Sequence, residues 1–304
     1  MPKFVRSAEN DGEERSRPRL QLVRRLLRSP TGLVGFALVL VAVATSLGAG
    51  ALAPHDPAEL NLRLRHIPPF WHDGGDPAFI LGTDQLGRDI LSRIIFGSQV
   101  SLFVGIMGTL AAVVIGVPLG LVSGFFGGWI DSVISRILDT FLAVPFLVLA
   151  LAVLAVIGPR GGGGTTVLIV VLGLTGWITF TRVVRAEVLS IKQREYVEAA
   201  HALGQTVPRI VTRHVLPNVA ASVIVLSTLQ VATFILAESA LSFLGLGVQA
   251  PTVTWGLMLS EGRDYLATSW WFATFPGLAI TLTVLGIILL GDWLRDLLDP
   301  RHET

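Results

Sequence analysis

The ionisable and nucleophilic residues of this chain of 304 residues do not form a set that could catalyse a covalent reaction. The sequence has no cysteine, its six histidines are scattered, and no His, Asp, Glu and Ser side chains share a catalytic spacing. It also lacks the Gly-x-x-x-x-Gly-Lys-Ser/Thr phosphate loop of ATPases. We therefore expect a protein that is not an enzyme and binds no metal or cofactor itself. Any energy that it uses from ATP must be supplied by another polypeptide.

The residues best suited to recognition lie between 192 and 217. Residues 195–203 favour a helix, and Gly204 suits the left-handed conformation that commonly follows a helix end. Thr206 can cap a second short helix, which Pro217 is expected to end. The small side chains at this bend would let a partner surface approach closely, although a solvated connector is the plainer alternative. The predicted docking residues are Glu198, Ala199, Ala200, Gly204, Leu216 and Pro217.

A second polar motif lies between residues 81 and 97. Thr83 or Asp84 can cap a helix on which the apolar side chains from Ile90 to Ile95 line one face. We expect this short helix to lie at the membrane interface, with the charged residues before it in local ion pairs or against a partner. The motif residues are Gly82, Thr83, Asp84, Gly87, Arg88 and Asp89.

Two polar residues within a long apolar segment are candidates for a solute pathway. Glu238 is ionisable, and such residues are rare inside membranes and often functional. It could attract the amine of a solute, pair with Arg263, or be an interfacial carboxylate. Gln230 could line a pore or bond a neighbouring helix.

Six long apolar segments predict the elements that position these residues. Hydrophobic residues make up 52% of the chain and charged residues only 15%, against roughly 25% charged in soluble domains. A membrane helix needs about 20 apolar residues, and runs without strand alternation are expected to be helical. The first run is too long for the core of a cleaved signal peptide. The sequence therefore predicts an all-α polytopic membrane protein with six transmembrane helices, at about 32–53, 99–125, 137–157, 165–181, 219–238 and 270–290.

The distribution of basic residues predicts the orientation of these helices. With the N-terminus inside, 17 of the 23 Arg and Lys residues fall in inner segments and 6 in outer ones. Because inner loops carry the excess of positive charge, both termini and the loop 192–217 are expected in the cytoplasm.

Three motifs make the chain resemble a known family. The run Glu198–Pro217 resembles the EAA loop of ABC importer permeases, although His214 stands where the general pattern has Ile. The Gly-Thr-Asp-x-x-Gly-Arg-Asp string at 82–89 is similar to the hallmark of the C-type permease subunit of dipeptide and oligopeptide importers. The run 238–251 is similar to the same subfamily, and the resemblance extends from about residue 20 to residue 300.

This resemblance implies a type I ABC importer permease fold in the cytoplasmic (inner) membrane of a prokaryote. In the family, the loop at 192–217 is a coupling helix that fits a cleft in an ATPase subunit. ATP and Mg²⁺ would be bound by these partner ATPases and not by this chain. The implied partners are a second permease, two ATPase subunits and an extracytoplasmic solute-binding protein, with no nucleic acid.

The resemblance also divides the chain into parts. Residues 1–31 would be a cytoplasmic tail, 32–97 the first transmembrane helix with an outer segment, 98–291 the permease core, and 292–304 a second cytoplasmic tail.

The implied function is passage of dipeptides, oligopeptides or related solutes across the membrane. Related members import nickel or other solutes, which leaves the substrate open. A secondary transporter is a further alternative, but we find no convincing repeat between the two halves and no charged residue near the middle of a span.

Overall fold

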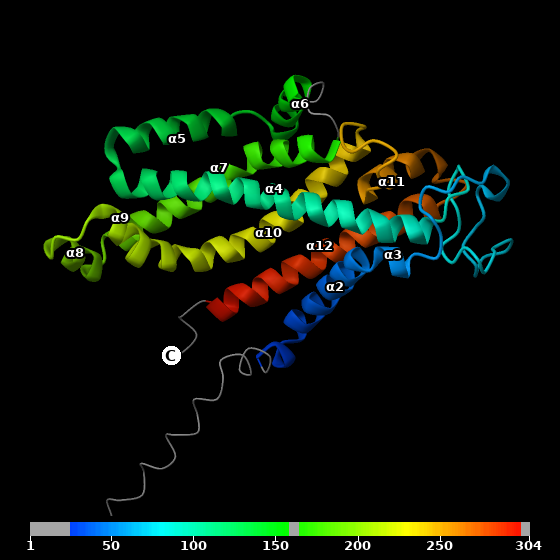
Figure 1. The fold of residues 1–304 in the computed structure, drawn as a ribbon, viewed down its shortest axis with the longest axis horizontal. Coiled ribbons are helices and arrows are strands. Elements are labelled where there is room, and N and C mark those ends of the chain that lie inside the picture. Colours follow the sequence, from blue (N-terminus) through cyan, green and yellow to red (C-terminus); the bar gives the residue numbers. More distant parts are fainter. Residues whose placement is uncertain (1–24, 158–163, 299–304) are drawn as a thin grey trace, which may run out of the picture.

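Long helices account for most of the residues that the computed structural model describes, which are 25–157 and 164–298 (Figure 1). Two short 3-10 helices, Leu62–Leu64 and Arg263–Tyr265, and a π-helical stretch, Val211–Val215, complete the regular structure. The α-helices are α2 (Pro30–Leu47), α3 (Ala49–Leu52), α4 (Ile90–Phe126), α5 (Gly128–Leu142), α6 (Phe146–Ile157), α7 (Gly164–Lys192), α8 (Glu195–Ala202), α9 (Val207–Ile210), α10 (Leu216–Phe243), α11 (Trp255–Gly262) and α12 (Trp271–Leu298).

Five of these helical segments are long and apolar enough to cross a membrane, namely α2, α4, α7, the run Val207–Phe243 and α12. They carry the first, second, fourth, fifth and sixth predicted spans. Many of their large apolar side chains are exposed, such as Val41 on α2 and Val114 on α4. A water-soluble monomer rarely shows so much apolar surface, so lipid or another chain must cover these faces.

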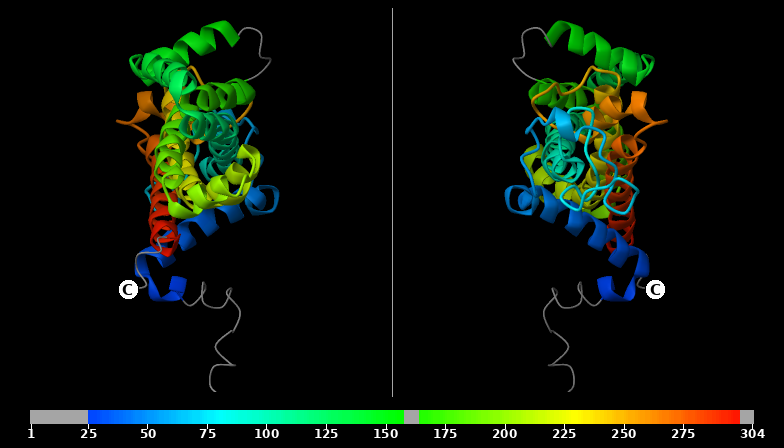
Figure 2. Two further views of the ribbon diagram at one scale, coloured as in Figure 1. Left: turned by 90° about the vertical axis from the view of Figure 1, so that its left-hand side faces the viewer. Right: turned by 90° about the vertical axis from the view of Figure 1, so that its right-hand side faces the viewer.

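The third predicted span, 137–157, is not one straight helix. It consists of the end of α5 and all of α6, which meet at a bend of 95°. The break lies at Pro145, because a proline disfavours helical geometry in the residue before it. Figure 2 shows α5 and α6 on one side of the bundle and α2 on the opposite side.

The prediction of a separate interfacial helix before the second span is also wrong. Residues 90–97 are the first turns of α4, which runs on without interruption for 37 residues. Neither Thr83 nor Asp84 caps this helix. The cap is Asp89, whose carboxylate accepts a hydrogen bond from the Ser92 amide at 2.8 Å.

The loop between α7 and α10 contains the two predicted short helices, but the second does not end at Pro217. That proline lies near the start of α10, directly after a π-helical turn in which the Leu216 N–H bonds the Val211 carbonyl. The residues from α9 through the π-helical stretch into α10 therefore form one helical run, Val207–Phe243.

The two ends of the described chain lie on the same side of the bundle. A β-carbon on Gly32 in α2 would be 2.6 Å from the Trp293 ring in α12. The helix α12 continues to Leu298 and so includes the first residues of the predicted C-terminal tail 292–304. Most of the predicted tail 1–31, and residues 299–304 of the other tail, lie outside the described residues.

The central contact of the fold is between α4 and α7, which lie side by side along most of their length (Figure 1). Glycines on α4 bring the two backbones together. β-Carbons on Gly120 and Gly124 would each lie 2.7 Å from the β-carbon of a valine on α7. The Thr181 hydroxyl of α7 donates a hydrogen bond of 3.2 Å to the Gly116 carbonyl of α4. Small residues are the usual means of close helix contact in membranes.

We expect Gly120→Ala to destabilise the protein by about 1–3 kcal/mol, because the added methyl meets the Thr181 carbonyl at 2.8 Å as well as Val184. Thermal unfolding in detergent should show a midpoint several degrees lower. Gly277→Ala on α12 is the matched control, since its nearest neighbour would be 3.7 Å away. Equal midpoints for the two variants would contradict the packing described here.

Candidate functional site

The loop between α7 and α10 forms one end of the molecule, where α8 and α9 project beyond the long helices (Figure 1). Gly204 follows α8 with a φ of +75°, so the predicted left-handed turn is confirmed. Thr206 precedes α9 as predicted, although its side chain makes no capping hydrogen bond.

The loop is attached firmly to the helices on either side of it. Val197, Ala200 and Ile210 are buried in one apolar cluster with side chains of α4, α7 and α10. The Tyr196 ring also lies 6.3 Å from the ring of His214 in the π-helical stretch. The loop is therefore packed against the ends of both α7 and α10.

The outer face of the loop is exposed and partly apolar. Glu198, Ala199 and Gly204 are exposed, as are Leu216 and Pro217 at the start of α10. Leu203, at this projecting bend, is 81% exposed. Ala200 differs from the prediction, because its side chain faces the core and only 4% of it is exposed.

The motif at 82–89 lies at the opposite end of the bundle, where it folds the outer segment onto α4 and α11 (Figure 1). Asp84 accepts hydrogen bonds from the amides of Leu86 at 2.8 Å and Arg88 at 3.0 Å. Its other oxygen bonds the Arg88 side chain at 2.6 Å and also pairs with Arg93. Both guanidinium groups reach Glu261 of α11, at 3.0 Å and 2.8 Å.

Four charged side chains therefore form a largely buried network, of which the sequence predicted only two members. Arg88 and Glu261 are 173 positions apart, so no local pattern could join them. Local ion pairs, one of the two predicted alternatives, are confirmed for Asp84 and Arg88.

The remaining motif residues shape the backbone of the outer segment. The Thr83 hydroxyl accepts a hydrogen bond from the Ile67 amide at 3.0 Å and donates one to the Leu64 carbonyl. Gly82 and Gly87 have φ angles of +81° and +76°, which favour glycine. At Gly87 a β-carbon would also collide with the Asn61 carbonyl.

Two family models match this chain. Residues 116–304 match the family described as binding-protein-dependent transport system inner membrane component. This chain belongs to that family. Residues 19–69 of the permease match a second family, described as the N-terminal TM domain of oligopeptide transport permease C.

The permease is similar to several curated relatives over most of its length. It is 42% identical to the di/tripeptide transport system permease protein DppC of Pseudomonas aeruginosa, over 90% of this chain and 88% of the relative. It is 39% identical to the dipeptide transport system permease protein DppC of Haemophilus influenzae, over 88% and 90%. A glutathione transport system permease protein of Pectobacterium atrosepticum is 39% identical, over 92% and 90%.

A solved structure shares the fold. The inward-facing methionine ABC transporter MetNI contains a chain that matches with a TM-score of 0.58 and 20% identity, over 69% of this chain and 98% of that one. The fold is thus that of a type I ABC importer permease, and the predicted family and fold class are confirmed.

The permease has a buried carboxylate where the sequence predicted a candidate pathway residue. Glu238 is fully enclosed. Its oxygens accept hydrogen bonds from Ser242 at 2.8 Å, Ser101 at 3.2 Å and Ser239 at 3.4 Å. The predicted pairing with Arg263 is absent from the described structure, where Arg263 bonds Asp264 instead. Glu238 therefore joins α10 to α4 in the permease.

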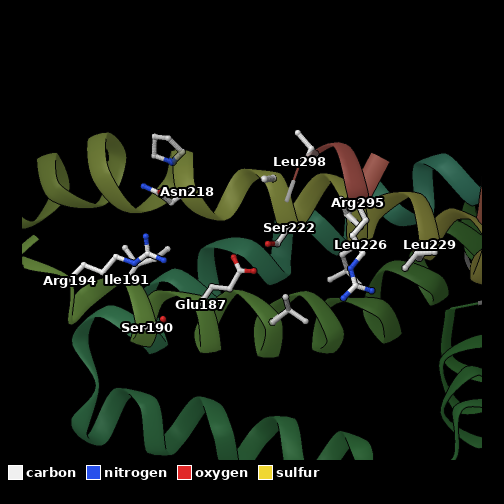
Figure 3. Close-up of a pocket in the computed structure, with 14 residues that line it drawn as sticks. Glu187, Ser190, Ile191, Arg194, Asn218, Ser222, Leu226, Leu229, Arg295 and Leu298 are labelled. Atoms are coloured by element: carbon white, nitrogen blue, oxygen red, sulfur yellow. The ribbon is translucent and has the colours of Figure 1, made fainter. Parts of the chain in front are cut away.

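A cavity of about 730 Å³ lies near the loop, between the end of α7, the first half of α10 and the end of α12 (Figure 3). Its lining residues include Glu187 of α7, Arg194 at the start of α8, Ser222 of α10 and Arg295 of α12. Neither Glu238 nor Gln230 lines it. Gln230 is buried within the bundle, and its role as a pathway residue stays a prediction. The cavity could not be predicted from the sequence, because its walls come from segments up to about a hundred positions apart.

We expect Asp84→Asn to destabilise the permease by about 3–5 kcal/mol, because it leaves two buried guanidinium groups with only Glu261. The measurement is the thermal midpoint of the purified protein. Asp264→Asn is the control, since both side chains of its pair with Arg263 are more than half exposed and such a pair contributes about 0–1 kcal/mol. A midpoint for Asp84→Asn as high as that of the control would refute a structural role of the network.

We expect Glu238→Gln to keep solute uptake within about twofold of wild type, because the amide oxygen can still accept from the neighbouring hydroxyls. Glu238→Leu should lower the thermal midpoint, since each unsatisfied buried hydroxyl costs about 1–3 kcal/mol. Uptake kinetics in vesicles measure the effect on transport, and thermal unfolding measures the effect on stability. Loss of uptake in a stable Glu238→Gln variant would instead place this carboxylate in the solute pathway.

Proposed function

We propose that this permease forms, with a second permease, the pathway of an ABC importer for dipeptides, tripeptides or similar peptide-like solutes. Two ATPase subunits would drive the complex by binding ATP and Mg²⁺, and an extracytoplasmic solute-binding protein would deliver the solute. The relatives named for dipeptide, di/tripeptide and glutathione transport support this solute class.

The observation that carries the proposal is the construction of the loop around α8. Its outer face exposes Leu203 and Glu198, while its inner face is buried against the helices that bracket it. A surface that is exposed on one side and packed on the other can receive a partner and pass on its movement. Closing of the ATPases on nucleotide would shift α8 as a rigid body, and the ends of α7 and α10 would move with it.

We further propose that the loop end of the bundle faces the cytoplasm. Both described ends of the chain lie on one side of the bundle, as an even number of crossings requires. The excess of basic residues in the segments on the loop side supports the same orientation. The anchored outer segment would then face the solute-binding protein.

The proposal predicts that Glu198→Arg weakens the association with the ATPase subunits. A reversed charge buried without a partner at an interface costs about 2–5 kcal/mol, which is roughly thirtyfold or more in affinity. The experiment is to co-express the permease with its neighbouring subunits, purify through a tag on it, and measure the amount of bound ATPase and its activity. Gly204→Arg, at an exposed position with a positive φ, should act in the same direction.

Asp264→Arg is the matched control, because it reverses an exposed charge at the other end of the bundle. It should retain the ATPase subunits at the wild-type level. If wild type binds no ATPase, or if Glu198→Arg binds as much as the control, the loop is not the coupling surface.

A further inference from the structure

The cavity between α7, α10 and α12 is lined by opposite charges that form no ion pair within the described part of the chain. Glu187 points into the cavity, with Arg194 on one side of it and Arg295 on the other (Figure 3). No ion pair within 4.0 Å joins any of the three to another described residue. Ser222, across the cavity, faces the Glu187 carboxylate.

The two arginines of α7 are paired. Arg182 bonds Asp139 at 3.1 Å, and Arg185 bonds Asp131 at 2.5 Å and 2.7 Å. The helix α7 thus neutralises its charges where it faces α5, but leaves Glu187 open towards the cavity. A half-buried carboxylate with no cation beside it is costly to hold in its charged form, which points to a ligand with a positive group.

We propose that this cavity binds a small zwitterion, a compound with a free amine and a free carboxylate. Glu187 would receive the amine, and Arg194 or Arg295 the carboxylate. Guanidinium groups match carboxylates with two parallel hydrogen bonds, which makes arginine the suitable partner. The volume of about 730 Å³ lies within the range of about 300–1,000 Å³ of small-ligand sites.

The site lies directly behind the coupling loop, since α7 ends at Lys192 and α10 begins at Leu216. A ligand there would connect the two helices that carry the loop. This inference rests on the proposed function for the identity of the ligand, which would be the imported solute on the loop side of the membrane.

The absence of cysteine from the chain allows a direct test. Ser190→Cys places a single thiol at the cavity, and Ser132→Cys places one on the exposed surface of α5. The rate of maleimide labelling of each is measured in the assembled complex, without nucleotide, at increasing dialanine concentrations. N-acetyl-dialanine amide, which has neither charge, is the matched control ligand.

We expect dialanine to slow labelling of the Ser190→Cys variant several-fold and to leave the Ser132→Cys variant unchanged. N-acetyl-dialanine amide should protect neither. Adding Glu187→Gln should raise the half-protecting dialanine concentration about tenfold or more, because a charge-assisted hydrogen bond is lost. Asp139→Asn, which removes an exposed pair outside the cavity, should have no such effect.

Three results would overturn the inference. They are no protection by dialanine, equal protection by the uncharged control ligand, and a thiol at position 190 that the assembled complex covers in the absence of ligand. If ATPase subunits co-purify normally while protection is absent, the proposed function stands and the zwitterion site fails. If no ATPase associates, the same labelling on the permease alone tests the cavity separately from the proposed function.

Discussion

The close contact between α4 and α7 is the constraint on which the rest of the permease depends. In hydrocarbon no hydrophobic force drives one apolar helix against another, so contact must come from packing and hydrogen bonds. Gly116, Gly120 and Gly124 remove the side chains that would hold the two backbones apart, and the Thr181 hydroxyl bonds across the contact. Because α7 leads directly into the loop with α8, this contact also sets where the loop projects.

The charged residues at the two ends of the bundle differ in burial, and therefore in whether they stabilise the fold or can meet a partner. At one end of the bundle, Asp84, Arg88, Arg93 and Glu261 satisfy one another and are largely buried, so they stabilise the outer segment and offer little to a partner. At the other end, Glu198 and its neighbours are exposed above an apolar inner face. A buried ion network that loses one member is strongly destabilised, whereas an exposed charge can change partners at little cost.

The exposed apolar surface of this chain must be covered by lipid or by a partner chain. Large side chains on α2 and α4 are exposed, and α5 with α6 lies on one outer side of the bundle at a bend of 95°. Lipid can cover a straight apolar helix. The bend near Pro145 leaves backbone groups without helical partners, which lipid cannot satisfy, so this region is where protein contact from a second permease would matter most.

The sequence by itself determined the helical class, the approximate positions of five of the spans, the turn at Gly204 and the family, because these depend on composition, local conformation and contiguous motifs. Only the tertiary structure decided what Glu238 contacts, which acid joins Arg88 from 173 positions away, and where the cavity with Glu187 lies. It also showed that the helical run Val207–Phe243 continues through Pro217 and that residues 90–97 belong to α4. The physical reason is that a local pattern specifies backbone propensity, whereas burial and charge pairing depend on which distant helices pack together.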